Sequence, residues 1–292
     1  MPFTLAHPAL VLPVLRSRHV SATGLIIGSM TPDVEYFLTM SDQCNNSHTL
    51  MSVFNSYLPL TLILSLIFHV FIRRSLMDNL PAFFQQRYGG IRSFHFLNYL
   101  RRHWFVFLYS AAAGIALHFG WDSMTHGTGV FAYFIPFYSH RFLIWGNDYS
   151  MMIVLQYAST LLGMSAVIYY LFKYDAKRIV SVHKVSAAYW IAIVVIVSAV
   201  MWIRVDLIKD AITHRSLLIS LVSSFFIGLW LSGKWHRIYS LLRIYRIGRL
   251  FSAYDWSTGT VARQVYHTAR TIREEIPYYV KGNGQKWAEK QL

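Results

Sequence analysis

Five long apolar stretches divide the chain, and polar or charged loops separate them. The stretches are Met51–Ile72, Trp104–Trp121, Met151–Phe172, Ala187–Ile203 and Ser216–Leu231. A helix needs about 20 predominantly apolar residues to cross the hydrocarbon core of a bilayer. The pattern therefore predicts an all-α, multipass membrane helical bundle with about five full spans.

A shorter pair of apolar segments precedes these spans. Phe3–Leu15 and Val20–Met30 flank the basic turn Arg16–Arg18, and Pro8 and Pro13 interrupt the first segment. Both segments are too short to cross a bilayer comfortably, so we expect a tight helical hairpin packed among the longer helices. The basic residues follow the first apolar segment, which is not the order found in a secretory signal peptide.

Composition agrees with a membrane protein. The chain is 55% hydrophobic and only 14% charged, whereas soluble domains are roughly a quarter charged. Cys44 is the only cysteine, which excludes an internal disulfide and a Cys-rich zinc site. Any metal ion must therefore be bound by histidines and carboxylates.

Basic residues are distributed asymmetrically between the loops. On one side lie 23 of the 27 Lys and Arg residues, in Arg16–Arg18, Arg73–His103, Lys173–Ser186 and the tail after Leu231. The opposite loops hold four, and without the tail the asymmetry is still 12 against 4. Because cytoplasmic loops carry an excess of Lys and Arg, the distribution predicts a cytoplasmic C-terminus.

Candidate chemistry appears at the end of the second apolar stretch. The segment HFGWDSMTH carries His118, Asp122 and His126. Residues at i, i+4 and i+8 share one side of a helix, so the three side chains form a stripe if the helix continues that far. Imidazole and carboxylate groups are good ligands for zinc, manganese and iron, so the pattern indicates a candidate metal site.

Further imidazole and carboxylate groups fall on the same predicted side of the membrane. Asp33 and Glu35 lie in SMTPDVEYF, and His48 lies in NSHTLMSVF just before the first long span. His7 starts on this side if the first short segment runs inward. Taken singly, Asp33 also suits a helix N-cap, His48 suits an interfacial position and His7 suits a structural role.

Together these residues favour one shared pocket. Ionisable side chains at membrane depth are costly and usually functional, so a metal site is the preferred interpretation. A polar network that holds helix ends together and a proton path are the alternatives. Gln156, Tyr157 and Ser159 would line the pocket or bond between helices. We interpret His69, near the other end of its span, as structural or interfacial.

The chain changes character after Leu231, so we divide it into a membrane-embedded domain, residues 1–231, and a basic tail, residues 232–292. Apolar residues at helical spacing and arginines three apart predict an amphipathic helix in this tail: Trp235, Ile238, Leu241, Leu242 and Tyr245, with Arg243, Arg246 and Arg249. Such a helix lies on the cytoplasmic leaflet and binds anionic lipid. Nucleic acid is not expected as a partner.

Five motifs, in the order MPFTLAHPA, GSMTPDVEYF, SHTLMSVF, HFGWDSMTHG and LQYASTLLG, closely resemble an uncharacterised bacterial membrane family, the domain of unknown function DUF4184. The resemblance runs from Met1 to about Gly163 and more loosely through the last spans. The family has no assigned activity. With the charge distribution, the resemblance implies a multipass protein of the bacterial cytoplasmic (inner) membrane, with the polar cluster on the non-cytoplasmic side.

A more distant resemblance concerns the order of the polar motifs. The series His, PD-x-[DE], [ST]-H-[ST] and HxxxDxxTH is similar to the predicted membrane-bound metal-dependent hydrolases and, beyond them, to zinc-dependent phospholipase C. It implies a hydrolytic site with two or more divalent ions, and the candidate ligands are His7, Asp33, His48, His118, Asp122 and His126. The secreted phospholipases also use their N-terminal amine, which has no counterpart here.

The distant resemblance implies a metal-dependent hydrolase, and the membrane setting favours a lipid or a lipid-linked phosphoester as its substrate. Zinc is the expected ion, with manganese or iron as alternatives. Glu35 would act as general base or ligand, and His126 as general acid or ligand. Two other functions use the same cluster: a proton-coupled transporter or channel, and a non-catalytic membrane scaffold. The last two spans carry few polar residues in their middle, which argues against transport.

The predicted sidedness can be checked with reporter fusions placed after successive spans. Fusions within Arg73–His103, within Lys173–Ser186 and after Leu231 are expected to report a cytoplasmic position, because these segments are rich in Lys and Arg. Fusions within Gly28–Leu50 and Asp122–Ser150 are expected to report the opposite side. The same signal from both groups would contradict the shared pocket.

Overall fold

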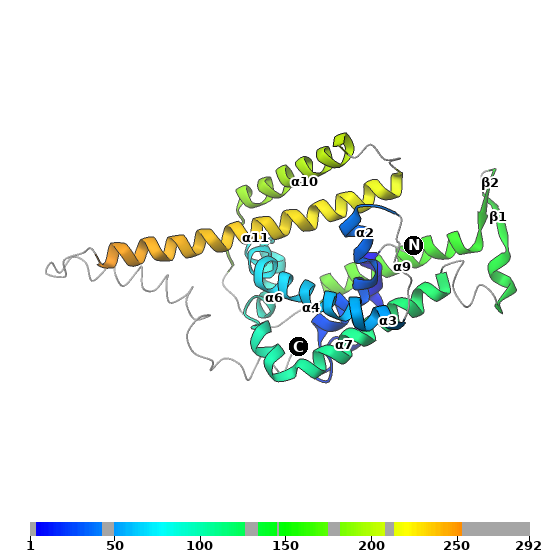
Figure 1. Cartoon of the computed structure of the whole chain (residues 1–292), viewed down its shortest axis with the longest axis horizontal. Helices are drawn as coiled ribbons and strands as arrows, with labels where there is room; N and C mark the ends of the chain where they lie inside the picture. The colour runs from blue at the N-terminus through cyan, green and yellow to red at the C-terminus, as the bar shows by residue number, and fades with distance from the viewer. Residues whose placement is uncertain are drawn as a thin grey trace.

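The computed structural model describes residues 4–42, 50–125, 134–144, 146–174, 182–207 and 213–252. In this part of the chain, long helices pack around shorter N-terminal ones (Figure 1). The helical elements are, by type, the 3-10 helices η1 (Thr4–Leu10), η2 (Leu12–Val14), η3 (Thr31–Asp33) and η6 (Pro136–Ser139), the π-helical segments η4 (Val53–Tyr57) and η5 (Phe68–Ile72), and the α-helices α1 (Ala22–Met30), α2 (Val34–Thr39), α3 (Leu50–Ser52), α4 (Leu58–Ile67), α5 (Arg73–Asn79), α6 (Ala82–Arg92), α7 (Phe96–Thr125), α9 (Met151–Lys173), α10 (Ala187–Leu207) and α11 (His214–Ser252).

Among the described residues, five helical stretches are long and apolar enough to cross a membrane. They are Val53–Asn79, Phe96–Thr125, Met151–Lys173, Ala187–Asp206 and His214–Trp235. Each overlaps one predicted span, and most extend past it because the helix backbone continues into polar flanking sequence. The all-α, multipass helical bundle predicted from the sequence is confirmed.

The short N-terminal segments pack against each other as a hairpin, but its first arm is not an α-helix. Pro8 and Pro13 lie in η1 and η2, where they favour short 3-10 pieces over a continuous α-helix. The second arm is α1, whose N-cap Ser21 accepts a hydrogen bond from the Gly24 N–H at 3.2 Å. The Ser21 N–H donates to the Ser110 hydroxyl at 2.8 Å, which attaches the start of α1 to α7.

Glycines allow α1 and α7 to pack very closely. A Cβ atom added to Gly28 would lie 2.5 Å from the Ala111 carbonyl oxygen, and one added to Gly114 would lie 2.5 Å from that of Leu25. Gly24 makes a similar contact, so the two α1 glycines form a GxxxG pair of the type that brings membrane helices together. The contact places η3, which follows α1 directly, beside α7.

A small β-hairpin departs from the all-helical pattern. Strands β1 (Arg141–Ile144) and β2 (Asn147–Ser150) pair antiparallel, with Arg141 opposite Ser150. Gly146 lies in the turn with φ +77°, a conformation that favours glycine. The Arg141 guanidinium bonds the Asp148 carboxylate at 2.7 Å across the strands. The hairpin leads directly into α9 and lies at one end of the molecule in Figure 1.

Side-chain amides fix the approach to α10 against α5 and α6. The Gln85 amide donates to the His183 carbonyl at 2.9 Å and accepts from the His183 N–H at 2.7 Å. Asn79 accepts from the Ser186 N–H at 3.0 Å, and its carbonyl accepts from the Trp190 indole at 2.9 Å. These bonds tie the first and fourth candidate spans together at this end of the bundle.

Helix α11 continues from the last candidate span into the basic tail without interruption. It runs from His214 to Ser252, and Figure 1 shows it extending well beyond the other helices. The boundary predicted at residues 231 and 232 therefore falls inside one helix. The remaining tail, residues 253–292, lies outside the described part, and its attraction to anionic lipid stays a prediction.

Two glycines of α7 provide a matched test of the close helix contact. Gly114→Ala is expected to lower the free energy of unfolding by about 1–3 kcal/mol, because the new Cβ meets the α1 backbone. Gly120→Ala meets nothing within 4 Å and is expected to be neutral or to stabilise by up to about 1 kcal/mol. Thermal unfolding in detergent measures both. Equal effects of the two substitutions would contradict the proposed packing constraint.

Candidate metal centre

Two histidines and two aspartates from separate parts of the chain meet at one point. His7 comes from η1, Asp33 ends η3, and His118 and Asp122 lie one turn apart on α7. The His7 Nε2 atom is 3.2 Å from the Asp122 Oδ1 atom, and the His118 Nε2 atom is 3.4 Å from Asp122 Oδ2. The same His118 atom is 3.6 Å from Asp33 Oδ1. We call these four residues the His–Asp cluster.

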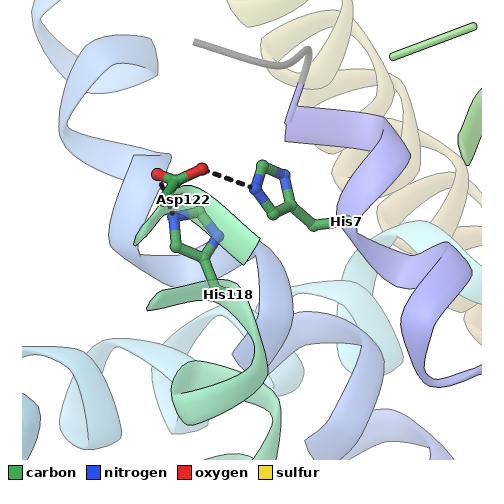
Figure 2. A group of neighbouring side chains, drawn as sticks. All are labelled: His7, His118 and Asp122. Carbon is green, nitrogen blue, oxygen red and sulfur yellow. Dashed lines mark hydrogen bonds and ion pairs between the residues drawn. The ribbon is translucent and has the colours of Figure 1, made fainter. Parts of the chain in front are cut away.

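Three members of the His–Asp cluster have the geometry of metal ligands. His7, His118 and Asp122 each offer one ligand atom, and these atoms lie within 4.8 Å of one another. Figure 2 shows the Asp122 carboxylate between the nitrogen-bearing edges of the two rings. These three residues could therefore hold one metal ion.

Backbone carbonyls hold both imidazole rings in orientation. The His7 Nδ1 atom lies 3.3 Å from the Thr4 carbonyl oxygen, and the His118 Nδ1 atom lies 2.8 Å from that of Ser29. Because a carbonyl oxygen only accepts hydrogen bonds, each Nδ1 carries the hydrogen. Each Nε2 atom is thereby turned toward the carboxylates, as in metal-binding histidines whose other nitrogen donates to a backbone oxygen.

The His–Asp cluster is buried except on one side. His7, Asp33 and His118 are at most 1% exposed, whereas the Asp122 side chain is 17% exposed. Within the described residues, the His118 Nε2 atom is buried without a hydrogen bond of good geometry. Burial raises the pKa of the Asp33 carboxyl above its usual range, while His118, His7 and the Thr4 hydroxyl oppose that rise. Because Asp122 is the one member of the cluster with appreciable exposure, solvent reaches the cluster from its side.

Local packing explains how η1 brings its histidine to this point. A Cβ atom added to Gly163 of α9 would lie 2.8 Å from the Ala6 Cβ atom, so η1 rests directly on α9. The Thr4 hydroxyl donates to the Asp33 carboxylate at 2.6 Å, which joins η1 to η3. His7 is thus placed by one backbone contact and one hydrogen bond rather than by a long helix.

A family model described as "Domain of unknown function (DUF4184)" matches residues 1–233, which include all four residues of the His–Asp cluster. The chain belongs to this family. No match was found among curated proteins or among solved structures. The family assignment confirms the close resemblance seen in the sequence and carries no activity with it.

The structure of this DUF4184 protein brings together His7, Asp33, His118 and Asp122, as the sequence predicted. The alternative role of Asp33 as a helix cap is wrong. Asp33 occupies the N-cap position of α2, but its side chain makes no capping hydrogen bond. It bonds Thr4 and faces His118 instead.

Three predicted site residues are not placed in the His–Asp cluster. Glu35 is partly exposed on α2, two positions after Asp33, and is not among the metal-ligand atoms found in the described residues. His48 and His126 lie outside the described residues. The roles of all three as ligands, base or acid stay predictions.

Sequence reasoning missed two groups that organise the cluster, the Thr4 hydroxyl and the Ser29 carbonyl. Thr4 lies one helical turn before His7, so its position was the available signal. The identity of a residue does not indicate what its backbone carbonyl binds.

Gln156 of α9 donates to the Thr125 carbonyl of α7 at 3.0 Å, which is an interhelical bond rather than a pocket contact.

Proposed function

We propose that the His–Asp cluster binds a divalent metal ion and that this DUF4184 protein is a membrane-bound metal-dependent hydrolase. One observation carries the proposal: two imidazoles, each held through Nδ1 by a backbone carbonyl, aim Nε2 at the same carboxylate, that of Asp122. A cation at the centre satisfies both nitrogens and both aspartates at once.

Ring stacking favours a metal ion over protons as the bound cation. The His7 and His118 rings are stacked, with centroids 4.1 Å apart and planes 19° apart. Two imidazolium ions at this separation repel each other strongly in a poorly solvated site. One metal ion between the Nε2 atoms and the carboxylates instead leaves both rings neutral, so their stacking carries no such penalty.

The number of ligands favours a catalytic ion over a structural one. Structural zinc sites use four protein ligands, whereas catalytic sites use three and keep a position for water or substrate. His7, His118 and Asp122 form such a set of three. Asp33, 3.6 Å from the His118 Nε2 atom, is close enough to act as a further ligand or to orient the water. Zinc suits this set best, and manganese and iron are the alternatives.

The membrane setting points to the class of substrate. A bound divalent ion lowers the pKa of its water to near 7 and polarises a phosphoryl oxygen. Asp122 is the exposed member of the cluster, so the substrate approaches from its side. A lipid or a lipid-linked phosphoester brings a hydrolysable group to this depth. Glu35 as base, and His48 and His126 as ligands of a second ion, complete the proposed site.

The location of the site follows from the charge distribution. We place this protein in the bacterial cytoplasmic membrane, with the C-terminus and the loops rich in Lys and Arg in the cytoplasm. The His–Asp cluster then faces the non-cytoplasmic side. The basic tail is positioned to bind anionic lipids of the cytoplasmic leaflet.

Metal analysis of the purified protein tests the site. Wild-type protein incubated with zinc and washed is expected to retain about one equivalent or more per chain, because the His–Asp cluster supplies at least three ligands. His118→Gln and Asp122→Asn are expected to weaken binding by at least about tenfold. The matched controls His69→Gln, another buried histidine of a candidate span, and Asp148→Asn are expected to bind zinc normally.

The metal proposal fails if folded wild-type protein retains no zinc, manganese or iron after this treatment. It also fails if the two cluster variants bind as much metal as the two controls. Circular dichroism and a single symmetric elution peak establish that each variant is folded before its metal content is compared.

Hydrolysis is tested separately with mixed micelles that contain phosphatidylglycerol or a polyprenyl phosphate ester. Metal-loaded wild-type protein is expected to release the phosphoryl product from one of them, and Asp122→Asn to slow the release at least about a hundredfold, since the ion contributes several kcal/mol. Asp148→Asn serves as control. Metal binding without hydrolysis of either lipid would retain the site and reject the hydrolase.

A further inference from the structure

A buried row of polar side chains follows the first candidate span, Val53–Asn79, along most of its length. The row repeats every four residues and consists of Tyr57, Thr61, Ser65, His69 and Arg73. All five are at least nine-tenths buried, although the surrounding sequence is strongly apolar. Sixteen residues of helix span about 24 Å, most of the hydrocarbon thickness of a bilayer. We call this row the polar stripe.

Helix α1 and the 3-10 helix η3 that follows it each supply one polar partner to the polar stripe. The Thr31 hydroxyl is 2.9 Å from the Thr61 hydroxyl, and the Thr23 hydroxyl is 3.0 Å from the His69 Nε2 atom. The stripe therefore runs along a buried interface between two helical segments and does not face lipid. Hydroxyl and imidazole groups are the side chains that pass protons most readily, since each both donates and accepts.

The polar stripe is linked to the His–Asp cluster through η3, close to the Tyr57 end of the stripe. Thr31 and Asp33 belong to the same three-residue helix η3, whose Thr31 side chain contacts Thr61 and whose Asp33 side chain faces His118. Arg73 marks the other end, where its guanidinium donates to the carbonyl oxygens of Ile91 and Phe94. The two ends of the stripe thus lie near the two ends of the span.

His69 is the member that a purely structural role does not explain. Its ring stacks on Phe96 with centroids 4.3 Å apart, and Phe68 and Phe94 contact its other sides. Its Nδ1 atom is buried and has no hydrogen-bond partner among the described residues. Arg73, the next member of the polar stripe, is positively charged. A buried, unpaired polar atom within a membrane span is costly and is usually retained for function.

The hydroxyls alone have a simpler explanation. The Ser65 hydroxyl donates to the Thr61 carbonyl at 2.7 Å, and the Thr61 hydroxyl donates to that of Tyr57 at 2.7 Å. Such bonds to the preceding turn satisfy a hydroxyl in any membrane helix. Packing therefore accounts for Thr61 and Ser65 singly, but not for the continuous row or for the ionisable residues in it.

We propose that the polar stripe is a proton path that joins the His–Asp cluster to the opposite end of the first candidate span. Each hydroxyl accepts a proton on one lone pair and releases its own, and His69 accepts at one ring nitrogen and releases from the other. The net result is the transfer of one proton, after which each side chain has its original number of protons. Neighbouring members are about one helical turn apart, a gap that a single water molecule bridges.

The path also has a use at the proposed site, because water bound by a divalent cation gives up a proton that must leave a largely buried cluster. Its existence does not require that the cluster hold a metal ion. The polar residues of this path lie in the first candidate span, whereas the sequence argument against transport considered only the last two spans.

Proton flux into liposomes that contain the purified full-length chain tests the path. A potassium diffusion potential set with valinomycin drives protons inward, and internal pyranine records the pH. Wild-type protein is expected to raise the flux at least roughly tenfold over protein-free liposomes, and His69→Gln to remove most of that increase. Glutamine keeps a polar group near Thr23 but does not titrate.

A matched serine pair separates proton transfer from packing. Ser65→Ala, on the polar stripe, is expected to lower the flux roughly threefold or more. Ser224→Ala, on α11, is expected to leave it unchanged. Both serines are fully buried, and both donate to the carbonyl four residues earlier, Ser224 at 2.6 Å. If His69→Gln does not fold, the difference in proton flux between these two serine variants tests the proton path.

Wild-type flux equal to that of empty liposomes overturns the path, as does equal flux in the two serine variants. The metal assay on the same preparations distinguishes the two proposals. Protein that binds zinc but carries no proton flux retains the metal site and loses the path. Protein that carries flux blocked by His69→Gln but binds no metal retains the path and loses the site.

Discussion

The close approach of α1 and α7 is the constraint on which the polar interior depends. At Gly28 and Gly114 there is no room for even one methyl group between the two backbones. At this separation the Ser29 carbonyl reaches the His118 ring, and Asp33 faces the same ring from the following turn. A looser contact would leave two carboxylates and an imidazole buried apart from one another, which is far more costly than burying them together.

The cost of burying charged side chains in the His–Asp cluster must be offset by contacts within the cluster, because little solvent reaches it. Each histidine is neutral or positive, each aspartate is negative or protonated, and the arrangement of Nδ1 bonds leaves the two Nε2 atoms facing oxygen. Hydrogen bonds and opposite charge are what make such buried groups tolerable. The proposed central cation would supply that compensation for the four side chains together, whereas protons would neutralise a carboxylate or charge an imidazole one group at a time.

Much of this arrangement was readable from the sequence, for identifiable physical reasons. Hydropathy reports length and apolarity, so the spans were predicted, and the asymmetry of Lys and Arg assigned His7, Asp33 and His118 to one end of the bundle. Neither signal reports which helices touch, so the GxxxG contact and the Thr4 bond to Asp33 were missed. The β-hairpin also escaped, because short strands in a mostly apolar chain carry no distinctive period.

The polar stripe shows how a periodic signal is lost when residues are considered singly. His69 alone suits a structural role, and Thr61 or Ser65 alone suits a bond to its own helix. Their common spacing of four residues becomes meaningful only once Thr23 of α1 and Thr31 of η3 are seen to contact them. Because η3 carries both Thr31 and Asp33, a shift in the α1–α7 contact would move one partner of the polar stripe and one member of the His–Asp cluster together. The polar stripe and the His–Asp cluster are therefore coupled through η3, whose position depends on the glycine contact between α1 and α7.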